Sequence, residues 1–377
     1  MKREYTLNEF ENGYKVADIS SSELYPEYIK KEATDALERV KKHQKEDSVN
    51  IAFITDIHYT MSEKNRIRMA RILNAYKEIA EGVEIEKLVI GGDHSCDGTK
   101  EYRIDALEEL KEQFGELEFF PITGNHDNGC IWSRGKEDFN GKDYVSHKDL
   151  YNSFFSHLEN TDVKFGKDEF SLYYMCDDEK KKIRYIFLDI ADIDYKFSGE
   201  EKPRYGIDWL FQMSQNQIDW FLNEALNFEE EGYSIIIFIH AIPLESETER
   251  AKSATWENIN FLSDITNAYK KGEKISLSFG EGNYKRHVLA DFSKYKRGDI
   301  IGYIAGDEHN DKLEKNSFGI PYIVTTNAFP FFYDPPHVQR RDGDKTEIAF
   351  DIITVNKKER MIYITRVGKG EDRKVGF

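Results

Sequence analysis

The sequence predicts an α/β fold with a largely parallel sheet. Apolar runs of strand length at residues 49–55, 87–90 and 117–123 alternate with segments of helical spacing at 64–81 and 101–114. Strands that alternate with helices in this order are typical of βαβ units, in which neighbouring strands run parallel. The carboxyl ends of such strands meet at one edge of the sheet, where open α/β folds bind their ligands.

The remaining segments extend this pattern toward the C-terminus. The periodicity predicts further helices at residues 28–44, 215–230, 255–271 and 283–296. Further strands are expected at residues 183–188, 234–239, 300–305, 320–325, 346–355 and 360–366. We interpret residues 1–48 as an N-terminal helical extension packed on a domain of residues 49–377. Residues 128–146 are expected to form a long loop, and the aromatic stretch 329–336 to pack in the core or at a rim.

The composition indicates a globular protein with an acidic surface. The chain has 377 residues, of which 39% are hydrophobic, so a sizeable core is expected. Its formal net charge of −17 disfavours nucleic acid and anionic membranes as partners.

Cysteine usage and hydropathy indicate where the protein works. Cys96, Cys130 and Cys176 form no CxxC pair, so we expect no disulfide framework. We find neither a signal-peptide core nor an apolar run of about 18 residues. We therefore expect a cytoplasmic protein.

Residues of metal-ligand type follow five of the predicted strands. Asp and His are common ligands for divalent metals, although a single Gly- and Asp-rich stretch is more often a turn. Recurrence at five strand ends favours a metal site. The five stretches are Asp56-Ile57-His58, Gly92-Asp93, Gly124-Asn125-His126-Asp127, His240 and Gly306-Asp307-Glu308-His309.

In order and residue type, these stretches resemble the calcineurin-like metallophosphoesterase family. The family pattern is DxH, GD, GNH followed by Asp or Glu, a single His, and GHxH, and here it spans residues 51–310. The resemblance implies the family's fold, a two-sheet β-sandwich flanked by helices. It also implies an enzyme that hydrolyses phosphate esters with two divalent metal ions.

The resemblance assigns a metal-binding role to seven residues. The first ion is expected to bind Asp56, His58 and His309, the second Asn125, His240 and Asp307, and Asp93 is expected to bridge both. Two ions about 3.5–4 Å apart can clamp the attacking and leaving oxygens of a phosphoryl group. A hydroxide that bridges the ions would attack phosphorus in line.

Two further residues are expected to take part in the chemistry. By resemblance, His126 donates a proton to the leaving oxygen or stabilises the transition state. We expect Asp127 to orient His126, because a carboxylate can fix the tautomer and orientation of an imidazole.

One position departs from the family pattern. Asp307 stands where the pattern has the first His of GHxH, so a hard oxygen replaces a nitrogen at the second ion. We expect Asp307 to ligate, which favours Mn²⁺ or Fe over Zn²⁺ and leaves Mg²⁺ open. The alternative is that Asp307 points away and the second site is weak.

The substrate is the least determined part of this prediction. We expect a phosphorylated small molecule, either a phosphomonoester or a phosphodiester, and the sequence carries no signal for oligomeric state. His94, Tyr59 and Asn128 adjoin motif residues and are candidate substrate contacts, with packing as the alternative for His94. A nuclease or nucleotide phosphodiesterase on the same core stays open, and so does a non-catalytic metal-binding scaffold.

Overall fold

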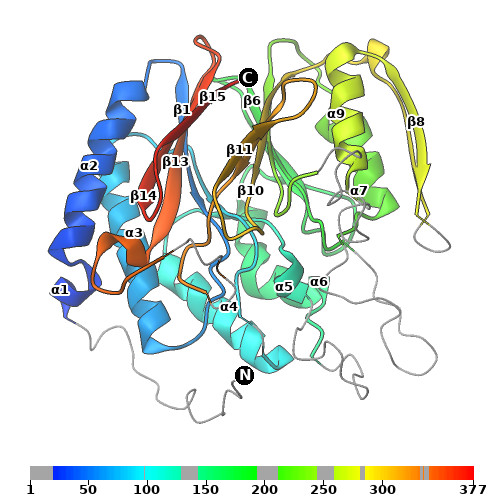
Figure 1. Ribbon diagram of the computed structural model, residues 1–377. Coiled ribbons are helices and arrows are strands. Elements are labelled where there is room, and N and C mark those ends of the chain that lie inside the picture. The colour runs from blue at the N-terminus through cyan, green and yellow to red at the C-terminus, as the bar shows by residue number, and fades with distance from the viewer. Residues whose placement is uncertain are drawn as a thin grey trace.

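The computed structural model shows two sheets that face each other, with helices on their outer sides (Figure 1). It describes residues 20–96, 98–128, 143–192, 211–243, 259–280, 285–331, 334 and 339–377. This arrangement confirms the expected α/β fold with a helix-flanked, two-sheet sandwich.

The first sheet has six strands and carries three of the five motif stretches. Its centre is parallel, because β1 pairs in parallel with β2, and β2 pairs in parallel with β3. Antiparallel strands from the C-terminal part of the chain complete it beyond β1. The order is β15 (Arg373–Gly376), β14 (Met361–Gly368), β13 (Ala349–Asn356), β1 (Ser48–Ile54), β2 (Lys87–Ile90) and β3 (Phe120–Pro121).

The second sheet has seven strands and carries the other two stretches. Strands β6, β7, β10 and β12 are parallel neighbours, whereas the edge strands are antiparallel. The order is β11 (Lys312–Lys315), β12 (Pro321–Val324), β10 (Asp299–Ala305), β7 (Ser234–Phe238), β6 (Ile183–Phe187), β5 (Tyr174–Asp178) and β4 (Lys164–Phe165).

Helices cover the outer sides of both sheets (Figure 1). On the first sheet lie α2 (Glu27–His43), α3 (Glu63–Gly82) and α4 (Lys100–Phe114), and the short α1 (Ser21–Leu24) packs against α3. On the second lie α7 (Gln215–Trp220), the π-helical turn η7 (Phe221–Ala225) and α9 (Phe261–Lys271). Shorter elements are α5 (Asn125–Asn128), α6 (His147–Leu150), η4 (Tyr151–Phe155), η5 (Ser156–Asn160), η9 (Phe292–Lys294) and η10 (Lys345–Glu347).

Local sequence signals explain where the first two βα connections end. The Ser62 hydroxyl accepts a hydrogen bond from the Asn65 amide, and the Thr99 hydroxyl accepts one from the Tyr102 amide. Both side chains satisfy amides that have no partner within the first turn of a helix. Each helix therefore starts a few residues after a motif stretch and leaves that stretch as a short loop.

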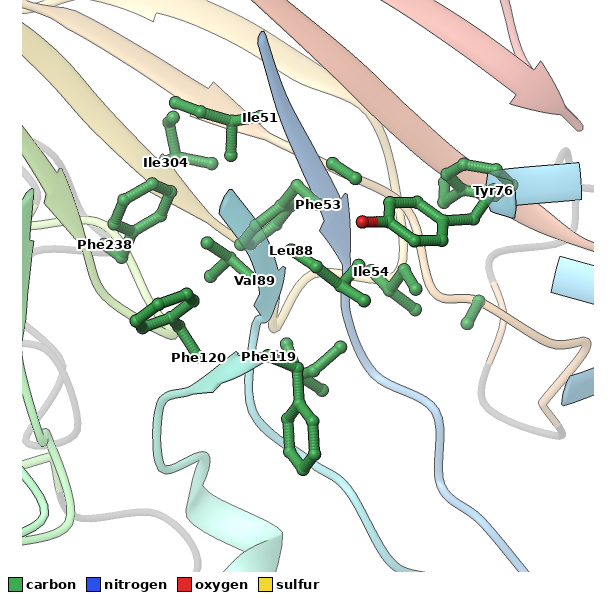
Figure 2. Close-up of a cluster of buried hydrophobic side chains, with 14 of the residues drawn as sticks. Ile51, Phe53, Ile54, Tyr76, Leu88, Val89, Phe119, Phe120, Phe238 and Ile304 are labelled. Carbon is green, nitrogen blue, oxygen red and sulfur yellow. The ribbon is translucent and has the colours of Figure 1, made fainter. Parts of the chain in front are cut away.

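The two sheets share an apolar core (Figure 2). Phe53 and Val89 of the first sheet face Phe238 and Ile304 of the second, and the Phe53 and Phe238 rings stack 6.2 Å apart. Alternate residues of a strand point to opposite faces, so Ile54 turns toward Tyr76 of α3 instead. This core holds the strand ends of both sheets in fixed positions.

The structure corrects one expected helix. Residues 283–296 contain β9 (Arg286–Asp291), which pairs with β8 (Lys274–Phe279), and then the short η9. Burial alternates along β9, with Val288 and Ala290 buried and Leu289 exposed, as a strand requires. The predicted helix at 215–230 also ends early, after η7.

Other predictions fall partly outside the described residues. Most of the expected loop 128–146 lies there, as do Cys130 and residues 1–19. Helix α2 packs against α3, β13 and β14, and the separate extension 1–48 stays a prediction. Within the described part of the chain, none of the helices combines the length and hydropathy needed to cross a bilayer.

Candidate metal centre

The motif stretches meet where the strands of the two sheets end. Asp56 and His58 follow β1, Asp93 follows β2, and Asn125 opens α5 after β3. His240 follows β7 in the second sheet, and Asp307 and His309 follow its parallel neighbour β10. As expected, residues far apart in the sequence lie together at the carboxyl ends of parallel strands, and this holds in both sheets.

Four of these side chains converge on one point. Ligand atoms of Asp56, His58, Asp93 and His309 all lie within 4.8 Å of one another, and all four residues are buried. Nε2 of His309 lies 3.0 Å from Nε2 of His58 and 3.4 Å from Oδ1 of Asp56. This is the set that the sequence assigned to the first ion, together with the bridging aspartate.

A second group lies on the other side of Asp93. Nε2 of His240 is 3.3 Å from Oδ2 of Asp93 and 3.8 Å from Oδ1 of Asp307. Nδ1 of His240 lies 2.7 Å from the Gly91 carbonyl oxygen, which directs Nε2 toward the carboxylates. Asp307 therefore points into the cluster and not away from it.

The backbone is strained at the ligand-type residues. Positive φ angles occur at Asp56 (50°), His58 (44°), Asp93 (52°), Asp307 (69°) and His309 (49°). Only two other described residues besides glycine, Lys182 and Arg360, share this conformation. Left-handed backbone is unfavourable for residues with a Cβ, and such strain gathers at functional sites.

Motif glycines make room for the cluster. Gly92 has a φ of +93°, and a Cβ at this position would overlap the His240 imidazole. A Cβ on Gly306 would overlap the Asp56 carboxylate and the Thr55 hydroxyl. Both glycines are thus required by close approach to a ligand side chain.

Asp127 has a different contact from the one expected. Its carboxylate accepts hydrogen bonds from the amides of Asp93 (3.0 Å), His94 (2.7 Å) and Gly124 (2.7 Å). Both oxygens therefore join the β2 and β3 loops. The Asp127 carboxylate positions Asp93 by binding the backbone amide of Asp93.

His126 lies at the margin of the cluster. Its amide donates to Oδ1 of Asp93 (2.8 Å), and its Nε2 is 3.9 Å from Oδ2 of the same residue. Its side chain is 13% exposed, whereas that of Asp93 is 3% exposed. Of these two side chains, His126 is the one better placed to reach a bound molecule.

The buried histidines and carboxylates of the cluster shift one another's pKa values. Burial lowers the pKa of His58 to about 3, so its imidazole is neutral. Burial and the carboxylates of Asp56 and Asp93 raise the pKa of Asp307 to about 7, against the effect of His240. Although burial opposes it, Asp93 and Asp56 raise the pKa of His240 well above its ordinary value. Crowded carboxylates of this kind are stabilised by a metal ion.

The donor set fits divalent metals. Carboxylate oxygens and imidazole nitrogens are their usual protein ligands. Among the described residues, Nε2 of His240 is a buried atom without an aligned hydrogen-bond partner, and Oδ2 of Asp93 lies 3.3 Å from it.

The comparison with protein families agrees with this geometry. The sequence profile of calcineurin-like phosphoesterases matches residues 49–311. The chain belongs to this family. Membership confirms the resemblance drawn from the five stretches and identifies the chain as a metallophosphoesterase.

One solved structure shares this fold at low sequence identity. A dimetal phosphatase from Danio rerio superposes with a TM-score of 0.53 at 14% identity, covering 87% of this chain and 99% of that one. A NAD nucleotidase from Haemophilus influenzae has a TM-score of 0.35 at 13% identity, covering 87% and 49%. A 5'-nucleotidase precursor from Thermus thermophilus has a TM-score of 0.37 at 11% identity, covering 87% and 54%. No curated protein sequence matches this chain.

The three side chains considered as substrate contacts are buried in this phosphoesterase. The His94 ring packs 4.6 Å from that of Phe154. The Tyr59 hydroxyl donates to Glu109 (2.5 Å), and the Asn128 amide donates to the Ala191 carbonyl (2.9 Å). Because all three residues have 0% exposure, they support the loops and present no surface to a substrate.

Two features of the phosphoesterase were not found from the sequence. Phe331 and Asp334, in the stretch expected to pack at a rim, contact the histidines of the cluster. His147, Asp189 and Asp192 form another group of potential ligands beside a cavity of about 340 Å³. No motif marks either feature; both depend on segments brought together by the fold.

Proposed function

We propose that this phosphoesterase hydrolyses phosphate esters of small molecules with two divalent metal ions. The convergence of Asp56, His58, Asp93 and His309 within 4.8 Å carries the proposal. These four residues would hold the first ion. The second would be held by Asp93, Asn125, His240 and Asp307. The similarity to a protein described as a dimetal phosphatase supports the count of two.

The residues divide the chemistry between them. Bound divalent ions supply Lewis acidity and an acidified water for attack on phosphorus. Asp93 belongs to both sets of residues and would therefore fix the distance between the two ions. His126 holds a proton at Nε2 for the leaving oxygen, since it is beside Asp93 and partly exposed.

We infer that the ions are Mn²⁺ or Fe in preference to Zn²⁺. Asp307 Oδ1 faces His240 Nε2 at 3.8 Å, so a hard oxygen stands where the family pattern has an imidazole. Metal analysis by ICP-MS of the wild type and Asp307→His tests this. A shift toward Zn²⁺ in the variant is expected; unchanged metal content rejects the preference.

The substrate we propose is a phosphorylated small molecule. A net charge of −17 opposes approach of a polyanion, whereas bound cations offset that charge locally for a single phosphate group. Hydrolysis of p-nitrophenyl phosphate and bis-p-nitrophenyl phosphate with Mn²⁺ tests the activity. Turnover of the first indicates a phosphomonoesterase, and turnover of the second alone a phosphodiesterase.

The variant His126→Ala provides the control for chemistry. We expect it to keep both ions and lose about 10²–10⁴-fold in kcat, the usual share of general acid catalysis. A wild type that binds both ions but hydrolyses neither compound would instead support a non-catalytic scaffold.

A further inference from the structure

Phe331 and Asp334 lie against the metal-binding cluster. The Phe331 ring stacks on the His58 imidazole, with centroids 4.0 Å apart and planes 5° from parallel. The same ring meets His309 edge to face at 5.4 Å. One aromatic side chain therefore restricts the rotation of two of the four convergent residues.

Asp334 approaches His309 from the side away from the cluster. Its Oδ1 lies 3.3 Å from Nδ1 of His309, while Nε2 of that ring faces Asp56. These atoms are close but not aligned as a hydrogen bond, and contacts of this kind often tighten when a ligand binds. A carboxylate here would place the imidazole proton on Nδ1 and leave the Nε2 lone pair for a metal.

Asp334 is itself held by its neighbours. Its Oδ1 accepts a hydrogen bond from the side-chain amide of Asn327 (2.6 Å). Its Oδ2 accepts one from the backbone amide of Phe331 (3.0 Å). Asn327 is fully buried, and its own Oδ1 accepts a hydrogen bond from Arg340 (2.9 Å). These hydrogen bonds fix the orientation of the Asp334 carboxylate, and its Oδ1 also faces His309.

We propose that Asp334 is a positioning residue that orients His309 for binding of the first metal ion. The proposal rests on the metal-dependent function proposed above. It goes beyond that function because Asp334 lies outside every motif of the family pattern. The chain supplies this carboxylate from a segment 25 residues after His309 in the sequence.

The matched variants are Asp334→Ala, Asp334→Asn and Asp342→Asn. Asp342 is a nearby carboxylate in sequence, but it pairs with Lys64 (2.7 Å) and Arg68 (2.5 Å) and contacts no cluster residue among those described. Metal-free proteins are titrated with Mn²⁺ by calorimetry. Visible spectra of the Co²⁺-loaded proteins report the ligand geometry, and thermal unfolding checks the fold.

We expect Asp334→Ala to weaken Mn²⁺ binding at one of two sites by about 10–100-fold, the usual effect of losing a histidine's carboxylate partner. Asp334→Asn, which keeps the shape, should weaken it less and still change the Co²⁺ spectrum. Asp342→Asn should match the wild type in both readouts. Wild-type affinity and spectrum in Asp334→Asn would overturn the proposal, even if the alanine variant fails to fold. A wild type that binds neither Mn²⁺ nor Co²⁺ would overturn the metal-dependent function itself.

Discussion

Oδ2 of Asp93 lies 3.3 Å from Nε2 of His240, and this contact joins the two sheets at their shared edge. The same oxygen is 3.7 Å from Nε2 of His58, on the opposite side of the cluster. No other described carboxylate makes such contacts with both histidines. Asp93 is therefore the residue on which both halves of the site depend.

The first prediction is that Asp93→Asn weakens binding at both metal sites. An amide carries no charge to offset two cations, so Mn²⁺ content should fall to one ion or fewer per chain. Phosphatase activity should fall by more than about 100-fold, the upper cost of changing an outer partner of a ligand. ICP-MS and p-nitrophenyl phosphate hydrolysis measure the two effects. Asp299→Asn, on the surface, is the control; a fully loaded and active Asp93→Asn contradicts the bridging role.

The sequence was sufficient to predict which side chains converge, because the strands that precede them are buried and parallel. Apolar runs ending at Asp56, Asp93 and His240 marked where side chains leave the sheets, and parallel pairing brings such ends together. It could not show that Asp56 and Asp93 need left-handed backbone, since that conformation is imposed by the surrounding loops.

Contacts distant in sequence explain what was missed. Val288, Phe292 and Tyr295 fall at helical spacing, yet pairing with β8 makes residues 286–291 a strand, because tertiary context overrides a local pattern. Asp334 lies beside His309, and no hydrophobic periodicity in residues 329–336 of the sequence indicates this contact. The β9 strand could not be deduced without the position of β8, nor the Asp334 contact without the position of His309.

The second prediction concerns Asp127→Ala. Removing the carboxylate leaves three buried amides, of Asp93, His94 and Gly124, without an acceptor. Each unsatisfied buried donor costs about 1–3 kcal/mol, so the free energy of unfolding should drop by at least about 3 kcal/mol in urea titrations. Asp127→Asn keeps one acceptor oxygen and should lose less. An unchanged unfolding midpoint with a reduced kcat would instead restore the role of orienting His126.

The third prediction is that Gly306→Ala damages the metal site. The new Cβ would overlap the Asp56 carboxylate and the Thr55 hydroxyl, and both must shift. Overpacking of this kind costs about 1–3 kcal/mol in unfolding free energy, and displacement of Asp56 should weaken Mn²⁺ binding measured by calorimetry. In the control Gly376→Ala, the nearest atom is 3.4 Å from the new Cβ, so neither property should change. Wild-type Mn²⁺ affinity in Gly306→Ala would show that Asp56 tolerates the shift.

A separate group of ionisable side chains, His147, Asp189 and Asp192, lies beside a cavity that all three line. Nε2 of His147 is 3.3 Å from Oδ2 of Asp189, which is almost fully buried. Although burial opposes it, contact with Asp189 and the charges of Asp189 and Asp192 raise the pKa of His147 to about 9. The imidazolium is therefore favoured in the folded protein.

The fourth prediction is a loss of stability between pH 6.5 and 9. Because the folded pKa of His147 lies above its unfolded value of about 6.5, the stabilisation is complete below pH 6.5 and disappears as the pH rises through 9. A shift of this size corresponds to about 3 kcal/mol at most. Urea unfolding at a series of pH values should show this decline in the wild type and a flatter profile in His147→Gln. His43→Gln is the control, since burial lowers the pKa of His43 and places its titration below this window. Equal slopes in the wild type and His147→Gln would exclude the His147–Asp189 pair as the cause.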